Sequence, residues 1–192
     1  MTFEAIVDDY IRTYREGARQ EMEEFEAEPN SSAAIRRAAL CQMIDGKRHP
    51  HQRRVPKAVL EQVEAKLQGI HRRLSKATDF DGLHRLVDDE VGSIKGIGSL
   101  TVYDISHRIG AHLRKVPKRV YLHAGVRMGA KMLGIRGASF DPSILPKPFA
   151  RLAPSEIEDC LCIYKDDLAG MLGERRGQSA CVVVPKRRRG CE

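Results

Sequence analysis

Tryptophan is absent from this 192-residue chain, and aromatic residues make up only 5% of it. No apolar run approaches the roughly 20 residues that a membrane-spanning helix needs, so we expect no contact with a membrane. The first residues are acidic and amphipathic, which is not the pattern of a secretory signal. These absences together predict a cytoplasmic protein.

The cysteines form no pattern that is typical of a metal site. They number five and stand at positions 41, 160, 162, 181 and 191. Cys160 and Cys162 are too close in sequence for a pair of structural zinc ligands, and the other three do not complete a known spacing. We therefore expect free thiols in a reducing compartment, with no metal ion and no other cofactor.

Residues that favour helices fill most of the chain, and β-branched runs are few. This composition predicts an all-α fold, with one compact multi-helix domain over residues 1–173 and a basic, flexible tail over residues 174–192. Expected helices lie over residues 3–27, 31–43 and 80–91, from 99 onward, over 121–133, and in two further segments that begin after Pro56 and at Ser155. The pair Ser155 and Glu158 has the spacing of a capping box for the last of these. Its stripe of Ile157, Leu161, Tyr164 and Leu168 is predicted to be core.

The net charge of +7 is unevenly distributed along the chain. Residues 1–28 hold nine acidic residues against three arginines, a net charge of −6, whereas residues 29–173 carry +9. A polyanion would be attracted to the middle of the chain, and the acidic first helix would face away from it. A merely solubilising surface would explain excess charge but not this segregation.

Two glycines flank one apolar residue in the segment SIKGIGSLTVYDISHRIG, which spans residues 93–110. A helical pattern leads into Gly96-Ile97-Gly98 and a second one leaves it at once, with its apolar face at Val102, Ile105 and Ile109. Glycine lets the backbone turn sharply and approach another surface closely. Amides at such a turn and at the start of the following helix form an anion site. The alternative is a plain connection between two helices.

This segment resembles a helix-hairpin-helix DNA-binding motif, at about residues 80–114. The resemblance implies contacts with backbone phosphates of duplex DNA by the residues of the turn and of the first turn of the next helix, which are Lys95, Gly96, Ile97, Gly98, Ser99, Leu100 and Thr101. The helix expected after it, with Val126, Arg127, Ala130 and Gly134, is similar to the one that follows this motif in the helix-hairpin-helix base-excision DNA glycosylases. That superfamily implies DNA repair as the setting.

Two departures from the glycosylases bear on activity. The position of the family's catalytic Asp falls on His123, or on Tyr121 if the spacer is aligned differently, and the position of its nucleophilic Lys is Leu100. A neutral His cannot supply the negative charge that stabilises an oxocarbenium-like sugar. His123 and Asp104 are the weak candidates for a nonstandard catalytic site, and we expect a binding protein rather than an enzyme.

A loop between the second and third expected helices is rich in cations. Lys47, Arg48, Arg53 and Arg54 carry its permanent charges and are candidates for phosphate contacts. Considered alone, the loop could equally be a solvated surface. Beside the glycine-containing turn and the positive middle region, phosphate binding is the better interpretation.

Three hypotheses remain open. The first is a DNA-binding protein that grips the phosphate backbone without sequence specificity. The second is a glycosylase-like enzyme, which requires a pocket for one nucleobase beside the turn. The third is a protein-interaction module in which the turn is purely structural and the acidic first helix binds a basic partner.

Overall fold

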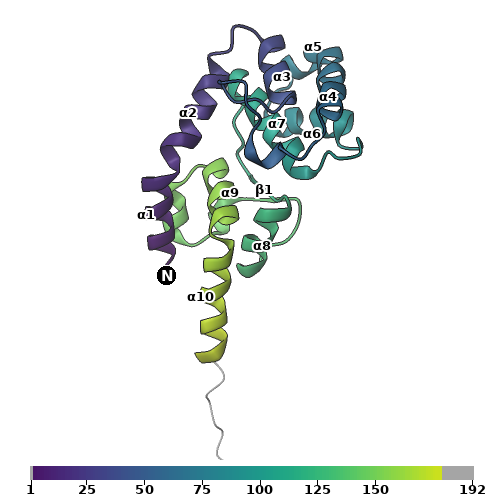
Figure 1. Cartoon of the computed structure of the whole chain (residues 1–192). Coiled ribbons are helices and arrows are strands. Elements are labelled where there is room, and N and C mark those ends of the chain that lie inside the picture. The colour runs from purple at the N-terminus through teal and green to yellow at the C-terminus, as the bar shows by residue number, and fades with distance from the viewer. Residues whose placement is uncertain (1, 179–192) are drawn as a thin grey trace, which may run out of the picture.

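The structure is a computed structural model that describes residues 2–178, and these residues are mostly helical (Figure 1). The α-helices are α1 (Phe3–Thr13), α2 (Arg15–Glu26), α3 (Ser31–Ala39), α4 (Lys57–Gly69), α5 (His71–Ser75), α6 (Phe80–Val91), α7 (Ser99–His112), α8 (Ala124–Met132), α9 (Pro154–Ile163) and α10 (Lys165–Gln178). Three 3-10 turns are η1 (Pro50–Gln52), η2 (Pro142–Ile144) and η3 (Lys147–Arg151). None of the described helices is long and apolar enough to cross a membrane.

The mostly helical fold also contains one small sheet, whose strands flank α8 on either side in the sequence. Strands β1 (Val120–Tyr121) and β2 (Ser139–Phe140) pair antiparallel, with Val120 opposite Phe140. The helix expected from Tyr121 therefore begins only at Ala124. β-branched and aromatic residues at 120 and 121 favour the extended backbone that the pairing with β2 then stabilises.

Two more expected boundaries differ from the structure. The first helix is interrupted at Tyr14, where α1 ends and α2 begins. The second helix ends at Ala39, because Cys41 adopts a left-handed backbone with φ of 51°. By contrast, α6 has the predicted bounds, and its N-cap Asp79 accepts a hydrogen bond from Gly82 N at 2.8 Å.

Buried apolar side chains form two hydrophobic clusters, which we use to define two lobes. The terminal lobe contains α1, residues 120–152 and α9 with α10, whereas the middle lobe contains α3 to α7 together with the end of α2. In Figure 1 the middle lobe lies above the terminal lobe, and α2 runs between them. The two ends of the described chain thus meet in one lobe, and the +9 region makes up most of the other.

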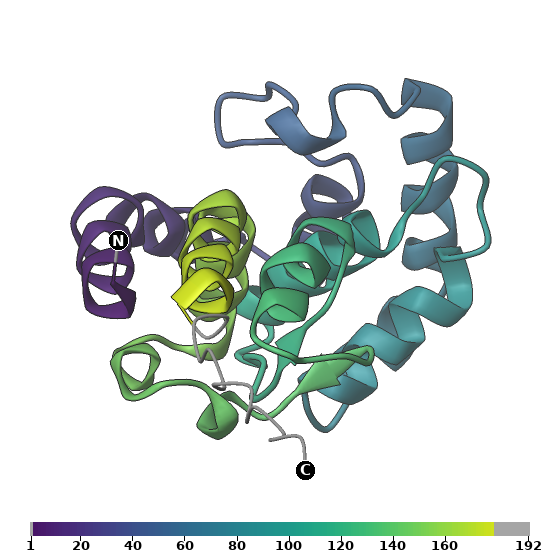
Figure 2. The ribbon, with the colours of Figure 1, turned by 90° about the horizontal axis from the view of Figure 1, so that it is seen from below.

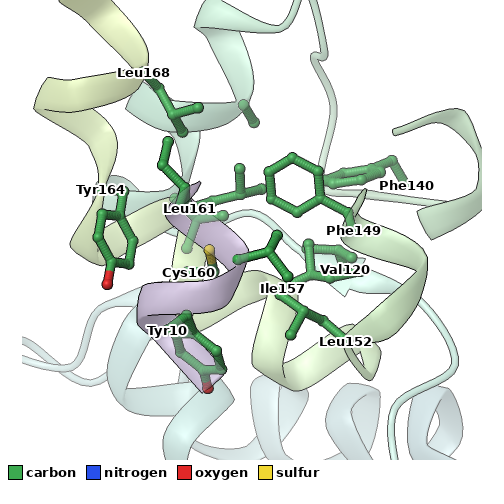
Figure 3. Packing of buried hydrophobic residues seen from close by; sticks show 14 of the residues in the cluster. Tyr10, Val120, Phe140, Phe149, Leu152, Ile157, Cys160, Leu161, Tyr164 and Leu168 are labelled. Atoms are coloured by element: carbon green, nitrogen blue, oxygen red, sulfur yellow. The ribbon is translucent and has the colours of Figure 1, made fainter. Parts of the chain in front are cut away.

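The core of the terminal lobe contains the apolar stripe that the sequence predicts. Ile157, Leu161, Tyr164 and Leu168 are all buried, and they point toward Tyr10 of α1 and the side chains of residues 120–152 in Figure 3. Burial of each large side chain stabilises the fold by about 1.5–3 kcal/mol. Seen from below, α10 lies between α1 and α8 (Figure 2).

The middle lobe is built around α7. Val102, Ile105 and Ile109 are buried against α3 and α6, which confirms the predicted face of this helix. The opposite side of α7 is directed toward the terminal lobe, so one helix separates the hydrophobic core from the space between the lobes. Of the predicted tail, residues 174–178 continue α10, and residues 179–192 lie outside the described residues.

Candidate functional site

The turn between α6 and α7, which we call the glycine turn, comprises residues 92–98. Its two internal hydrogen bonds run from Ile94 N to Val91 O at 3.0 Å and from Ile97 N to Ile94 O at 2.9 Å. Ile97 is buried in the core of the middle lobe. Gly96 has φ of +98°, a conformation that a residue with a Cβ rarely adopts. The turn is therefore anchored by its apolar residue and shaped by its first glycine.

The second glycine leaves the outer surface of the turn open. Gly98 is the N-cap of α7, with extended backbone, and a Cβ built on it would meet nothing within 4 Å. Among the described residues no side chain caps this helix. Because the first amides of a helix have no intrahelical acceptor, they are available to an anion. Lys95 and Ser99 are exposed beside them.

Two other residues predicted to contact phosphate lie further inside. Leu100 is half-buried, and Thr101 is only 7% exposed. Their backbone amides still belong to the first turn of α7, but the Thr101 side chain is directed into the lobe. The exposed groups of the turn are thus mainly the backbone of its glycines and the side chains of Lys95 and Ser99.

The basic loop, residues 47–54, lies near the glycine turn. It leads into α4, and a Cβ on Gly96 would lie 4.0 Å from Val59 Cγ1 of that helix. Arg53 and Arg54 are exposed, whereas Lys47 forms an ion pair with Asp45 at 2.9 Å. The two predicted phosphate-binding segments are thus connected through α4, which follows the basic loop and approaches Gly96 at Val59.

One side of the basic loop borders a hollow of about 550 Å³. Arg36, Arg48, Arg53 and Lys57 line it together with Glu61. Arg48 is partly fixed there, because its Nη1 donates to Val55 O at 2.5 Å. This concentration of cations suits a phosphate group.

The other side of the basic loop reaches the space between the two lobes. The sequence analysis did not predict a site in this space. A cavity of about 240 Å³ lies there, and we call it the interlobe cavity. It is lined by Ala18, Glu21, Met22, His49, Pro50, His51, Tyr103, Asp104, His107, Arg108, Ser155, Glu158 and Asp159. These residues come from α2, η1 and its flanks, α7 and α9, so the cavity exists only where both lobes meet.

Besides Glu21, which pairs with Arg108, three carboxyl groups border the interlobe cavity. Asp104 accepts a hydrogen bond from Gln52 Nε2 at 2.5 Å, Asp159 accepts one from the Tyr10 hydroxyl at 3.1 Å, and Glu158 is bonded to His123 Nε2. Burial raises the pKa of each of the three, that of Asp159 to about 8. Repulsion from neighbouring carboxyls adds to the effect at Glu158 and Asp159, whereas Arg108 and the hydrogen bond from Gln52 oppose it at Asp104. Asp159 therefore tends to keep its proton at neutral pH.

The capping box expected from Ser155 and Glu158 is wrong. Because Glu158 was assigned to the cap, the sequence did not indicate it as a residue of the cavity. The helix begins one residue earlier, at Pro154, with Ala153 as N-cap. Glu156 accepts the hydrogen bond from Ala153 N at 2.8 Å, while Glu158 is directed into the interior and is only 6% exposed. Two acidic residues stand next to each other here, Glu158 and Asp159, and this pair is the sequence signal that could have indicated a polar cavity.

A second cavity lies beside the glycine turn, and four aromatic or imidazole rings are part of its lining. This ring-lined pocket has a volume of about 370 Å³ and includes Ser99 of α7 with His84, Tyr103, Tyr121 and His123. Tyr103 borders both cavities, and its ring centroid is 5.6 Å from that of Tyr121. Two separate spaces thus flank the same helix.

The two weak catalytic candidates border different cavities. His123 is 3% exposed in the ring-lined pocket, and burial lowers its pKa, so the imidazole is neutral. Asp104 borders the interlobe cavity and is half-buried. Tyr121 donates its hydroxyl proton to Asp81 Oδ1 at 2.5 Å.

No family model, curated protein or solved structure matches this chain. Within residues 2–178, no three His, Cys, Asp or Glu side chains converge as a bound metal ion would require. The function must therefore be inferred from the geometry of these residues themselves.

Proposed function

We propose that this protein binds duplex DNA through backbone phosphates, with the glycine turn acting as a helix-hairpin-helix. The observation that carries the proposal is the open, uncapped start of α7 next to Gly98, which leaves room for a phosphate to approach the amides. Arg53 and Arg54 lie on the loop that leads into the neighbouring helix and add permanent charge. Groups that contact the backbone carry no sequence information, so binding is independent of sequence.

Acidic residues of the first segment form ion pairs within the chain, and this favours DNA rather than a basic protein as the partner. Arg37 pairs with Glu24 and with Glu28, each at 2.8 Å, and Arg108 pairs with Glu21 at 2.9 Å. These carboxylates are thereby neutralised within the chain. The cations that stay exposed in the middle lobe are free to attract a polyanion.

Gly98→Val tests the proposal directly. The backbone of Gly98 is extended, with φ of −110°, and its surroundings are open, so Val fits the fold and its side chain occupies the place of the phosphate. Fluorescence anisotropy with a labelled duplex over a salt series is the measurement. We expect wild-type dissociation constants of about 10⁻⁴ to 10⁻⁶ M near physiological salt, which weaken as salt rises. The variant should lose at least tenfold in affinity.

Gly69→Val is the matched control. Gly69 is exposed near the end of α4, and a Cβ there also meets nothing within 4 Å. It lies ten residues from Val59, about 15 Å along the helix. Circular dichroism verifies that both variants fold. Equal affinity of Gly98→Val and Gly69→Val would place the DNA contact away from the turn, and salt-insensitive or absent binding would overturn the proposal.

A glycosylase-like enzyme is the second candidate, and the ring-lined pocket is the observation that favours it. This space adjoins the glycine turn, as an extruded nucleobase would require, and rings of Tyr103, Tyr121 and His123 border it. Asp81 and Asp88 also border it and are its two carboxylates, the group that is missing at position 123. Chromatography of free bases released from damaged duplexes tests this activity. Release that is lost in His123→Gln or Asp81→Asn would establish it, and no release from any duplex would reject it.

A further inference from the structure

The interlobe cavity has an unusual charge balance that DNA binding does not use. Among the side chains of residues 2–171, no Lys or Arg forms an ion pair with Asp104, Glu158 or Asp159, whose partners are Gln52, His123 and Tyr10. Arg108, the cation of this cavity, is paired with Glu21, and its charge also lowers the pKa of Asp104. Three carboxyl groups therefore face one space that holds a single arginine, and that arginine already has a carboxylate partner.

Unpartnered buried atoms show that the cavity can satisfy a ligand that donates hydrogen bonds. His49 is 6% exposed and hydrogen-bonds to the backbone of Gln42, while its Nε2 has no hydrogen-bond partner in the described chain and lies 3.7 Å from Glu21 Oε1. Burial lowers the pKa of His49 to about 4, so Nε2 presents a lone pair. The hydroxyl of Tyr103, which is 2% exposed, also has no partner there. A buried polar atom without a partner costs about 1–3 kcal/mol unless a ligand or water satisfies it.

An apolar extension adjoins this polar cavity. A hollow of about 370 Å³ between α2 and α7, the outer hollow, shares Ala18, Met22 and Asp159 with it. Ala111 and Val116 border the far end, and the Val116 side chain is exposed. The lining of the outer hollow also includes the charged residues Arg19, Glu23, Glu26, Arg114 and Glu156, so its apolar surface is the part formed by Ala18, Met22, Ala111 and Val116. The two spaces together offer acceptors at one end and this apolar surface at the other.

We propose that the interlobe cavity binds a small organic cation, with an ammonium or guanidinium head among Asp104, Glu158 and Asp159 and a short apolar body in the outer hollow. The head donates several hydrogen bonds and supplies the positive charge that the carboxyls lack. A metal ion does not suit the cavity, because no three suitable ligands converge in the described chain. An anion would meet three carboxyl groups, and a neutral alcohol would not compensate a carboxylate.

Proton release follows from this arrangement. The carboxyls keep protons in the free protein because burial and mutual repulsion disfavour their charge. A cation among them favours the carboxylate form, so its binding expels a proton and tightens as pH rises. Calorimetry at pH 7 in two buffers with different ionisation enthalpies measures this release.

Three probes of similar length separate the chemical classes: n-hexylammonium, 1-hexanol and hexanoate. Binding is followed by thermal unfolding and calorimetry of the full chain. We expect n-hexylammonium to bind with release of up to one proton, and to bind at least tenfold more tightly than the alcohol or the carboxylate. Equal binding of the alcohol, or binding of the cation without proton release, would overturn the proposal.

Asp159→Asn tests where the head binds. Asn still accepts the hydrogen bond from Tyr10, and we expect about tenfold weaker binding of n-hexylammonium and a smaller proton release. Asp141→Asn makes the same substitution at an exposed position at η2 and should leave binding unchanged. Equal affinity of these two variants would also reject the site. Gly98→Val should bind the probe like the wild type, so this test and the DNA test fail independently.

Discussion

At the residue scale, Gly129 lets α8 lie directly against the backbone of α9. A Cβ at this position would lie 2.3 Å from Leu161 O, which cannot move without displacing the helix. We expect Gly129→Ala to lower the free energy of unfolding by about 1–3 kcal/mol, although the higher helix propensity of Ala offsets up to about 1 kcal/mol. Urea unfolding measures the difference.

Gly125→Ala is the control on the same helix. The Cβ there would lie 2.5 Å from Cys162 Sγ, the end of a half-buried side chain that can rotate away. Its effect should be smaller than that of Gly129→Ala. A larger or equal loss would show that the contact of α8 with α9 adapts to added volume.

Individual residues also show how far the sequence predicts the site. Gly96, Gly98 and the buried Ile97 are recognisable because a tight turn has few solutions in residue type. Glu158 is not, since a shift of two residues in the N-cap of α9, from Ser155 to Ala153, decides whether Glu158 caps the helix or enters the interior. Asp104 depends on a partner 52 residues away, Gln52, and no local pattern indicates such a pair.

At the element scale, Glu156 joins α2 to the start of α9. It is 7% exposed, accepts from Arg15 Nη2 at 2.9 Å and from Arg19 Nε at 3.3 Å, and also caps Ala153. Glu156→Ala leaves Arg15 without its carboxylate partner, and we expect the free energy of unfolding to fall by about 3 kcal/mol in urea denaturation. Glu16→Ala, an exposed change on α2, should cost less than about 0.5 kcal/mol. Similar losses in the two variants would mean that the ion pair contributes little.

Elements with strong local signals are the ones that the sequence predicts well. α6 has its predicted bounds because Asp79 caps it and its apolar residues recur at helical spacing. Strands β1 and β2 were missed, because two-residue strands are stabilised by a partner about 20 residues away rather than by their own pattern. The break at Tyr14 was missed for a related reason: the helical pattern continues through it, while α1 and the end of α2 pack in different lobes.

At the scale of the whole molecule, the space between the lobes could not be derived from the pattern of any one segment. It forms because α1 returns to pack with α9 and α10, which lie some 150 residues later in the chain. Hydrophobic periodicity predicts which face of a helix is buried, but not which distant helix covers it. The polar residues directed into that space therefore look like ordinary surface residues in the sequence.

The stability of the whole molecule should fall as pH rises from 6.5 to 8. Asp159 has its pKa raised to about 8 in the folded protein, and those of Glu158 and Asp104 are also raised by burial, so the folded state holds protons that the unfolded state releases near pH 4. His49 and His107, whose pKa values burial lowers to about 4, act in the opposite direction but only below about pH 6.5. Above that pH the carboxyl groups determine how stability depends on pH. The free energy of unfolding then falls by up to about 1.4 kcal/mol per pH unit for each proton that the folded state holds and the unfolded state has lost. Urea unfolding measured at steps of half a pH unit should show this decline. Asp159→Asn should make the decline shallower, and Asp141→Asn should leave it unchanged. A flat profile in the wild type would mean that these carboxyls are ionised in the folded protein, with water reaching the space between the lobes.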